Sequence, residues 1–178
     1  MDVELVATVG SLSSNSYLTA AETGDVLSLV AASSRCKAWN ALATADKELF
    51  LMRATRLLEQ FMEWDGRKVM DDQPIGWPRD FVYGPDRCLY LPNNVIPTQV
   101  KEAQALMALH LSEGFEADDQ AASPVDYIKV SSIAVSFASE RAARSSMLLP
   151  PEVVEKLRGF GEYIGASGRG RAVSLVRG

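Results

Sequence analysis

The order of hydrophobic and polar residues predicts that the chain is mainly helical. The clearest pattern spans residues 45–64, where apolar side chains recur mainly every three or four positions. The side chains on this stripe are Phe50, Leu51, Ala54, Leu57, Leu58 and Phe61. Asp65 and Gly66 follow as a turn pair of the kind that ends helices. We therefore expect one long helix whose apolar face packs against the core.

Further helices are marked by the residues that open them. Thr19 and Glu22 have the spacing of a capping box, which predicts a helix from there to about residue 31. Pro97 suits the first turn of a helix, where its missing N–H costs nothing, and Pro150 and Pro151 open a last helix in the same way. The predicted buried face after Pro97 consists of Val100, Ala103, Met107 and His110 or Leu111.

Alternating periodicity predicts a smaller amount of strand. Apolar and other residues alternate in residues 125–137, which predicts two short strands with a turn near Ser131 and Ser132, or one long bent strand. Residues 3–9 predict another short strand.

Residues 65–96 are predicted to form an irregular arm, because prolines and glycines interrupt them throughout. Their aromatic residues favour an ordered arm that packs partly on its own domain and partly on a neighbouring molecule. The block of residues 73–79, Gln-Pro-Ile-Gly-Trp-Pro-Arg, is rigid because each proline biases the preceding residue toward an extended conformation. Two interpretations stay open: the block packs inside its own domain around Trp77, or it belongs to an assembly surface.

These patterns together predict a mainly α fold. We expect a small helical bundle with a short β-hairpin or extended strand pair, a long irregular arm, and a C-terminal helix plus tail. Residues 1–137 would form the core, including the arm of residues 65–96 and the strands of residues 125–137. Residues 138–178 would form a C-terminal connection, a helix and a flexible basic tail.

Charge is distributed unevenly along the chain. Residues 1–140 hold 11 Lys and Arg against 20 Asp and Glu, a balance of −9, whereas residues 141–178 hold 7 against 3, a balance of +4. An acidic body is a poor surface for tight nucleic-acid binding, because neutralising phosphates supplies most non-specific affinity. The basic, glycine-rich tail is of a kind that orders on binding a partner.

Candidate chemistry is sparse. No nucleophile elbow, P-loop, zinc-protease motif or Cys-x-x-Cys pair is present, so we expect no enzyme and no cofactor. Cys36, Cys88 and the single histidine, His110, are too few for a zinc site. The longest apolar run is far shorter than the roughly 20 residues of a membrane span. The N-terminal residues lack the basic region of a signal peptide, which predicts synthesis in the cytosol without membrane association.

The order of several motifs resembles a known family. Residues 15–22 read Asn-Ser-Tyr-Leu-Thr-Ala-Ala-Glu, residues 73–79 contain Gln-x-x-x-Trp-Pro-Arg, and residues 96–100 contain Ile-Pro-x-x-Val. Over about residues 3–137 this arrangement is similar to the head–tail adaptor (connector, or head-completion) proteins of tailed bacteriophages. That group is also labelled as having a DnaT-like single-stranded-DNA-binding domain. The chain departs from the group's pattern at Ile75, where leucine is usual, and in its long Gly-Arg tail.

The resemblance implies a structural protein of the virion neck, assembled in the host cytoplasm. Identical subunits, commonly twelve, would form a ring beneath the portal protein, extend the channel for double-stranded DNA without sequence-specific binding, and dock a downstream neck, stopper or tail protein. We expect Arg169, Arg171, Leu175 and Val176 to contact the portal. The residues expected to contact a neighbouring subunit are Trp77, Arg79, Phe81, Tyr83 and Tyr90.

The alternative function is single-stranded-DNA binding. Such a module interleaves basic and aromatic residues on one face. The segment from Trp77 to Arg87 comes closest to this pattern, although Asp80 and Asp86 dilute its positive charge.

Overall fold

The computed structural model describes residues 4–84, 88–115, 129–130, 133–134 and 149–164, and it confirms a mainly α fold with short strand pairs. The helices are α1 (Ala20–Val30), α2 (Ser33–Asn40), α3 (Thr44–Phe61), α4 (Thr98–Ser112) and α6 (Pro151–Leu157). The strands are β1 (Met62–Trp64), β2 (Arg67–Lys68), β3 (Arg79–Asp80), β4 (Lys129–Val130), β5 (Ile133–Ala134) and β6 (Gly161–Tyr163).

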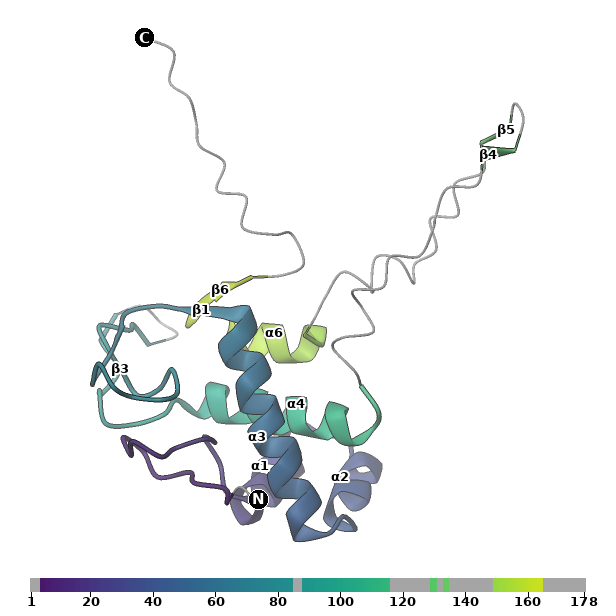
Figure 1. Ribbon diagram of the computed structural model, residues 1–178, viewed down its shortest axis with the longest axis horizontal. Helices are drawn as coiled ribbons and strands as arrows, with labels where there is room; N and C mark the ends of the chain where they lie inside the picture. Colours follow the sequence, from purple (N-terminus) through teal and green to yellow (C-terminus); the bar gives the residue numbers. More distant parts are fainter. Residues whose placement is uncertain (1–3, 85–87, 116–128, 131–132, 135–148, 165–178) are drawn as a thin grey trace.

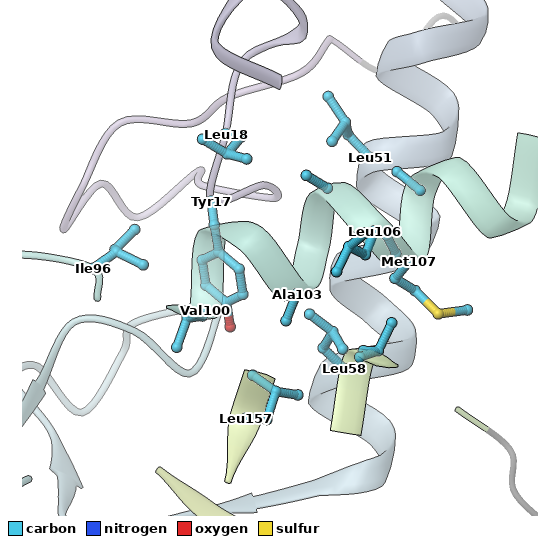
Figure 2. Packing of buried hydrophobic residues seen from close by; sticks show 14 of the residues in the cluster. Tyr17, Leu18, Leu51, Leu58, Ile96, Val100, Ala103, Leu106, Met107 and Leu157 are labelled. Carbon is cyan, nitrogen blue, oxygen red and sulfur yellow. The ribbon is translucent and has the colours of Figure 1, made fainter. Parts of the chain in front are cut away.

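Helix α4 lies at the centre of the molecule. Helices α1, α3 and α6 all pack against it, and α3 crosses it in Figure 1. Beyond the predicted apolar face, Ala105, Leu106 and Leu109 are also buried, so the middle of α4, residues 103–109, is covered on all sides. In Figure 2, Leu106 and Met107 of α4 lie in one cluster with Leu58 of α3 and Leu157 of α6.

A polar network crosses this core. The buried Gln104 amide nitrogen donates to Ser16 Oγ at 2.7 Å, to Thr55 Oγ1 at 2.8 Å and to the Leu51 carbonyl at 3.1 Å. Because buried polar groups need such partners, the network fixes the N-terminal loop and α3 in one register against α4. The capping box at the start of α1 is confirmed, with Thr19 Oγ1 accepting from the Glu22 N–H.

A charge cluster fastens α2 to the ends of α4 and α6. The Arg35 guanidinium donates to both carboxylate oxygens of Glu113 at 2.7 Å and to Glu152 at 3.2 Å. His110 contacts the same Glu152 carboxylate. The hydrogen bonds from Arg35, together with its positive charge, outweigh burial and lower the pKa of Glu113 below 4.5. Burial raises the pKa of Glu152, but hydrogen bonds from His110 and Arg35 outweigh burial and lower it.

This cluster predicts a specific acid sensitivity. Since both carboxyls have lower pKa values in the folded state, the unfolded chain binds more protons at acid pH, and the stabilisation is lost as pH falls below about 4.5. Arg35→Gln is expected to flatten the fall of unfolding free energy between about pH 5 and 3, by less than about 1 kcal/mol per carboxylate because the groups are partly exposed. Urea unfolding at several pH values measures this slope. The exposed Arg53→Gln should leave it unchanged, and an unaltered slope for Arg35→Gln would contradict the assignment.

The helix predicted for residues 45–64 ends at Phe61, because the next residues pair with a distant strand. β1 and β6 are antiparallel, with Met62 opposite Tyr163 and Trp64 opposite Gly161. The predicted strand at residues 3–9 is wrong for residues 4–9: Val6 instead bonds the Asn15 side chain and the backbone of a compact loop.

Two other predictions concern the C-terminal half. β4 and β5 pair antiparallel, with Val130 opposite Ile133, which confirms two short strands around residues 131–132. A division of the chain after residue 137 falls outside the described residues and stays a prediction. Helix α6 nevertheless shares the core of the N-terminal helices, because Val153 and Leu157 are fully buried there.

None of the described helices is both long enough and apolar enough to cross a membrane. In the same part of the chain, no three His, Cys, Asp or Glu side chains are grouped where they could hold a metal ion.

Candidate functional site

The block of residues 73–79 folds into the interior around Trp77. The Trp77 indole is 1% exposed and packs edge-on against Trp64 and Phe160, with ring centroids 5.8 and 6.0 Å away. The Trp77–Pro78 peptide bond is cis. The Gln73 amide nitrogen donates to the carbonyls of Ile75 at 2.7 Å and Pro78 at 3.1 Å, which closes the block on itself.

Arg79 is held by backbone carbonyls. Its guanidinium donates to four of them: Asp65 at 2.6 Å, Gly66 at 2.9 Å, Gly76 at 3.1 Å and Trp64 at 3.3 Å. Burial lowers the pKa of this guanidinium from its ordinary value. The side chain joins the turn after β1 to the 73–79 block.

A second buried contact fixes the other side of the block. The Tyr17 hydroxyl and the Trp64 indole N–H both donate to one carboxylate oxygen of Glu59, the latter at 3.3 Å. Burial, followed by the nearby Glu59 charge, raises the pKa of Tyr17 well above 10.0. Sequence analysis did not identify this contact, because no local spacing relates Tyr17 to Glu59.

The expectation that five arm residues face a neighbouring subunit therefore needs correction. Trp77 and Arg79 are used inside their own chain, since both are buried and Arg79 has its hydrogen-bonding partners there. Phe81, Tyr83 and Tyr90 remain accessible, with exposed fractions of 57%, 45% and 54%. The block of residues 73–79 thus packs inside its own domain around Trp77, and an assembly surface at Phe81, Tyr83 and Tyr90 stays a prediction.

These three side chains form one aromatic cluster on the surface. The rings of Tyr83 and Tyr90 are stacked with centroids 4.3 Å apart, and Phe81 meets Tyr90 edge-on at 6.0 Å. The Arg67 guanidinium lies 4.9 Å from the Phe81 ring centroid. Hydrogen bonds of 2.8 Å, from Leu91 N to Val82 O and from Gly84 N to Leu89 O, hold the two sides of the arm together. The cluster is therefore ordered as well as exposed.

Phe81 also adopts a strained backbone conformation. Its φ is +60°, in the left-handed region that non-glycine residues rarely occupy. Gly66, itself at φ +70°, lets the chain pass close to Asp80 and Phe81. Sparsely populated backbone conformations cluster at functional sites, which makes Phe81 a candidate functional residue.

Cations near the arm are largely engaged by their own chain. The Lys68 ammonium donates to the Gln73 carbonyl at 2.8 Å, and Arg67 lies 3.8 Å from the Asp80 carboxylate. Arg53 and Arg56 on α3 are exposed and have no ion-pair partner among the described residues. An open cleft of about 440 Å³ beside Arg56 is lined also by Asn15, Glu59 and Pro74. The tail residues Arg169, Arg171, Leu175 and Val176 lie outside the described part of the chain.

Comparison with known protein families finds a match over nearly the whole chain. A family model described as "Putative DnaT-like ssDNA binding protein" matches residues 3–178. No curated protein and no solved structure matches the chain. Because the family model covers nearly the whole sequence, the chain belongs to this DnaT-like family.

Proposed function

We propose that the chain is a structural subunit of a phage neck, a head–tail adaptor that forms a ring under the portal. The observation that carries this proposal is the aromatic cluster of Phe81, Tyr83 and Tyr90, which is exposed while Arg67 contacts Asp80 and Lys68 donates to the Gln73 carbonyl. Aromatic side chains are enriched in the cores of protein interfaces, where charged residues are depleted. The cluster therefore suits a protein partner better than a phosphate backbone.

A ring needs two different surfaces on each subunit, because a head-to-tail contact closes only when one surface meets the other. The aromatic cluster would supply one of them, with the exposed Leu89 beside it. The C-terminal tail would then be left for the portal through Arg169, Arg171, Leu175 and Val176. A net charge of −5 favours a channel in which double-stranded DNA slides rather than sticks.

The first test of this proposal is assembly. Phe81→Ala combined with Tyr90→Ala is expected to reduce ring formation at least about tenfold, because hot-spot aromatics dominate interface energies. Analytical ultracentrifugation and electron microscopy of the protein with purified portal measure this. The matched control is Leu29→Ala, which removes a side chain that is 84% exposed on α1, and it should assemble normally. Rings formed equally well by the double variant would refute the assignment of the cluster.

The tail has its own test. A chain ending at residue 164 is expected to fold, with an unchanged unfolding midpoint, and to lose attachment to portal-bearing heads. Normal attachment of this truncated chain would refute the tail assignment.

Single-stranded-DNA binding is the second candidate, and the family description supports it more directly than it supports the adaptor role. The stacked Tyr83 and Tyr90 rings, with Arg67 over the adjacent Phe81 ring, would receive bases, since base–aromatic stacking contributes about 1–3 kcal/mol per base. Fluorescence anisotropy with labelled oligo(dT) at low and high salt separates the two candidates. Tight, salt-sensitive binding that Tyr90→Ala weakens would favour this module, and its absence would favour the adaptor.

A further inference from the structure

Helix α3 presents one continuous stripe of side chains to solvent. Its four members are exposed and lie on one face, because they are spaced by four, three and four residues: Leu49, Arg53, Arg56 and Gln60. This face is named the arginine stripe. The opposite face of α3 is buried in the core.

The two arginines of the stripe have no partner within the described residues. Neither Arg53 nor Arg56 forms an ion pair there, and neither lies over an aromatic ring. The open cleft of about 440 Å³ adjoins the stripe at Arg56 and Gln60, with Pro74 also in its wall. Its volume is that of a small-ligand pocket, so it has room for an aromatic side chain.

The arm carries the complementary chemistry. The faces of aromatic rings attract cations, and a planar guanidinium stacks on them. The Arg67 guanidinium lies over Phe81, whereas no described cation lies over Tyr83 or Tyr90. The same arm exposes Asp71 and Asp72, whose carboxylates form no ion pair with a described residue. The arm therefore offers aromatic rings and negative charge to an outside partner.

We propose that the arginine stripe of one copy of the chain binds the arm of the next copy. Arg53 and Arg56 stack on the Tyr83–Tyr90 pair, and one ring of the aromatic cluster enters the cleft beside Arg56. This inference rests on the proposed function, and it names the second of the two surfaces that a head-to-tail ring needs. Each subunit then uses its arm on one neighbour and its arginine stripe on the other.

The charges of α3 favour a second copy of the chain over DNA as the partner. Three basic residues are balanced by three acidic ones along the helix: Lys47, Arg53 and Arg56 against Asp46, Glu48 and Glu59. Binding to phosphates draws its affinity from net positive charge, which this helix lacks. Arginine and exposed apolar area, here Leu49, are instead typical of protein interfaces.

Mixing two defective variants tests the pairing. The arm variant is Phe81→Ala with Tyr90→Ala, and the stripe variant is Arg53→Glu with Arg56→Glu, so each keeps one surface intact. Each alone is expected to self-associate at least about tenfold more weakly than the unaltered chain. Mixed in equal amounts without portal, they are expected to form a dimer with one copy of each and nothing larger, because a single intact pair of surfaces is available. Analytical ultracentrifugation measures both results.

The matched control is Lys37→Glu with Arg158→Glu. It makes the same change of net charge on exposed side chains outside both surfaces, and it should associate like the unaltered chain. An unchanged midpoint of urea unfolding shows that each variant is folded.

Several results would overturn the pairing: a stripe variant that self-associates like the unaltered chain, a mixture that stays monomeric, or an unaltered chain that is itself monomeric. Weaker binding of oligo(dT) by the stripe variant, with unchanged self-association, would assign the arginines to nucleic acid and reject the pairing too. If the stripe variant still forms rings with portal, the adaptor role stands and this pairing alone fails, so the two failures are distinguishable.

Discussion

Replacing Arg79 by alanine is expected to lower the free energy of unfolding by about 3–5 kcal/mol, close to the largest effects seen for single substitutions. The guanidinium satisfies the carbonyls of Trp64, Asp65, Gly66 and Gly76, and alanine would leave them with no donor from this position. Arg79→Lys should be intermediate, because one ammonium cannot reach both ends of this fork. Urea denaturation monitored by tryptophan fluorescence measures the change.

The matched control for Arg79 is Arg53→Ala on the exposed face of α3. It removes the same side chain from a helix surface, and its effect should stay within about 0.5 kcal/mol. If Arg79→Ala were as mild as this control, the hydrogen bonds to the four carbonyls would contribute little to stability.

Gly66→Ala is expected to be the second severe substitution, with a loss of about 3 kcal/mol or more. A Cβ atom there would lie 2.1 Å from the Asp80 carbonyl oxygen, which is backbone and cannot swing aside, and the residue has φ +70°. Gly114→Ala separates the steric clash from the cost of positive φ, because Gly114 has φ +88° and, apart from its chain neighbours, no atom of the described residues lies within 4 Å of the added Cβ. It should lose only the roughly 1–2 kcal/mol of the left-handed conformation.

Thermal unfolding of the two glycine variants measures the difference. Equal destabilisation of Gly66→Ala and Gly114→Ala would mean that backbone conformation alone accounts for Gly66, and that the close approach of β2 and β3 is not rigid. Because Gly66 lies against the backbone of Asp80 and Phe81, Gly66→Ala is also expected to displace Phe81 and disturb the aromatic cluster.

The helices could be predicted from the sequence because their signals are local. The stripe ending at Phe61, the Thr19–Glu22 capping box and Pro97 each act within a few residues. The pairing of Met62 with Tyr163 joins residues far apart in the chain, and no short-range pattern reports it. It also explains why the long helix ends with its stripe at Phe61 and does not continue to residue 64 as predicted.

At the candidate site, too, local sequence patterns could not predict which residues of the arm come together. Prolines and aromatics marked residues 65–96 as an ordered, irregular arm, but they could not separate the buried Trp77 from the exposed Phe81. The acceptors that draw Arg79 inward are backbone carbonyls, which every residue carries, and they converge only when the turn after β1 meets the block. An arginine next to tryptophan therefore looks the same in sequence whether it faces solvent or the core.

The Arg35 cluster predicts that the helical body tolerates an insertion between α4 and α6. One guanidinium binds Glu113 just before residue 116 and Glu152 just after residue 148, so the two ends of that stretch are held close together by α2. The entropy of closing a loop grows only slowly with its length. We therefore expect that a fluorescent domain or an affinity tag spliced between Phe115 and Leu149 would leave the helical body folded, and would mark the position of each subunit in an assembly.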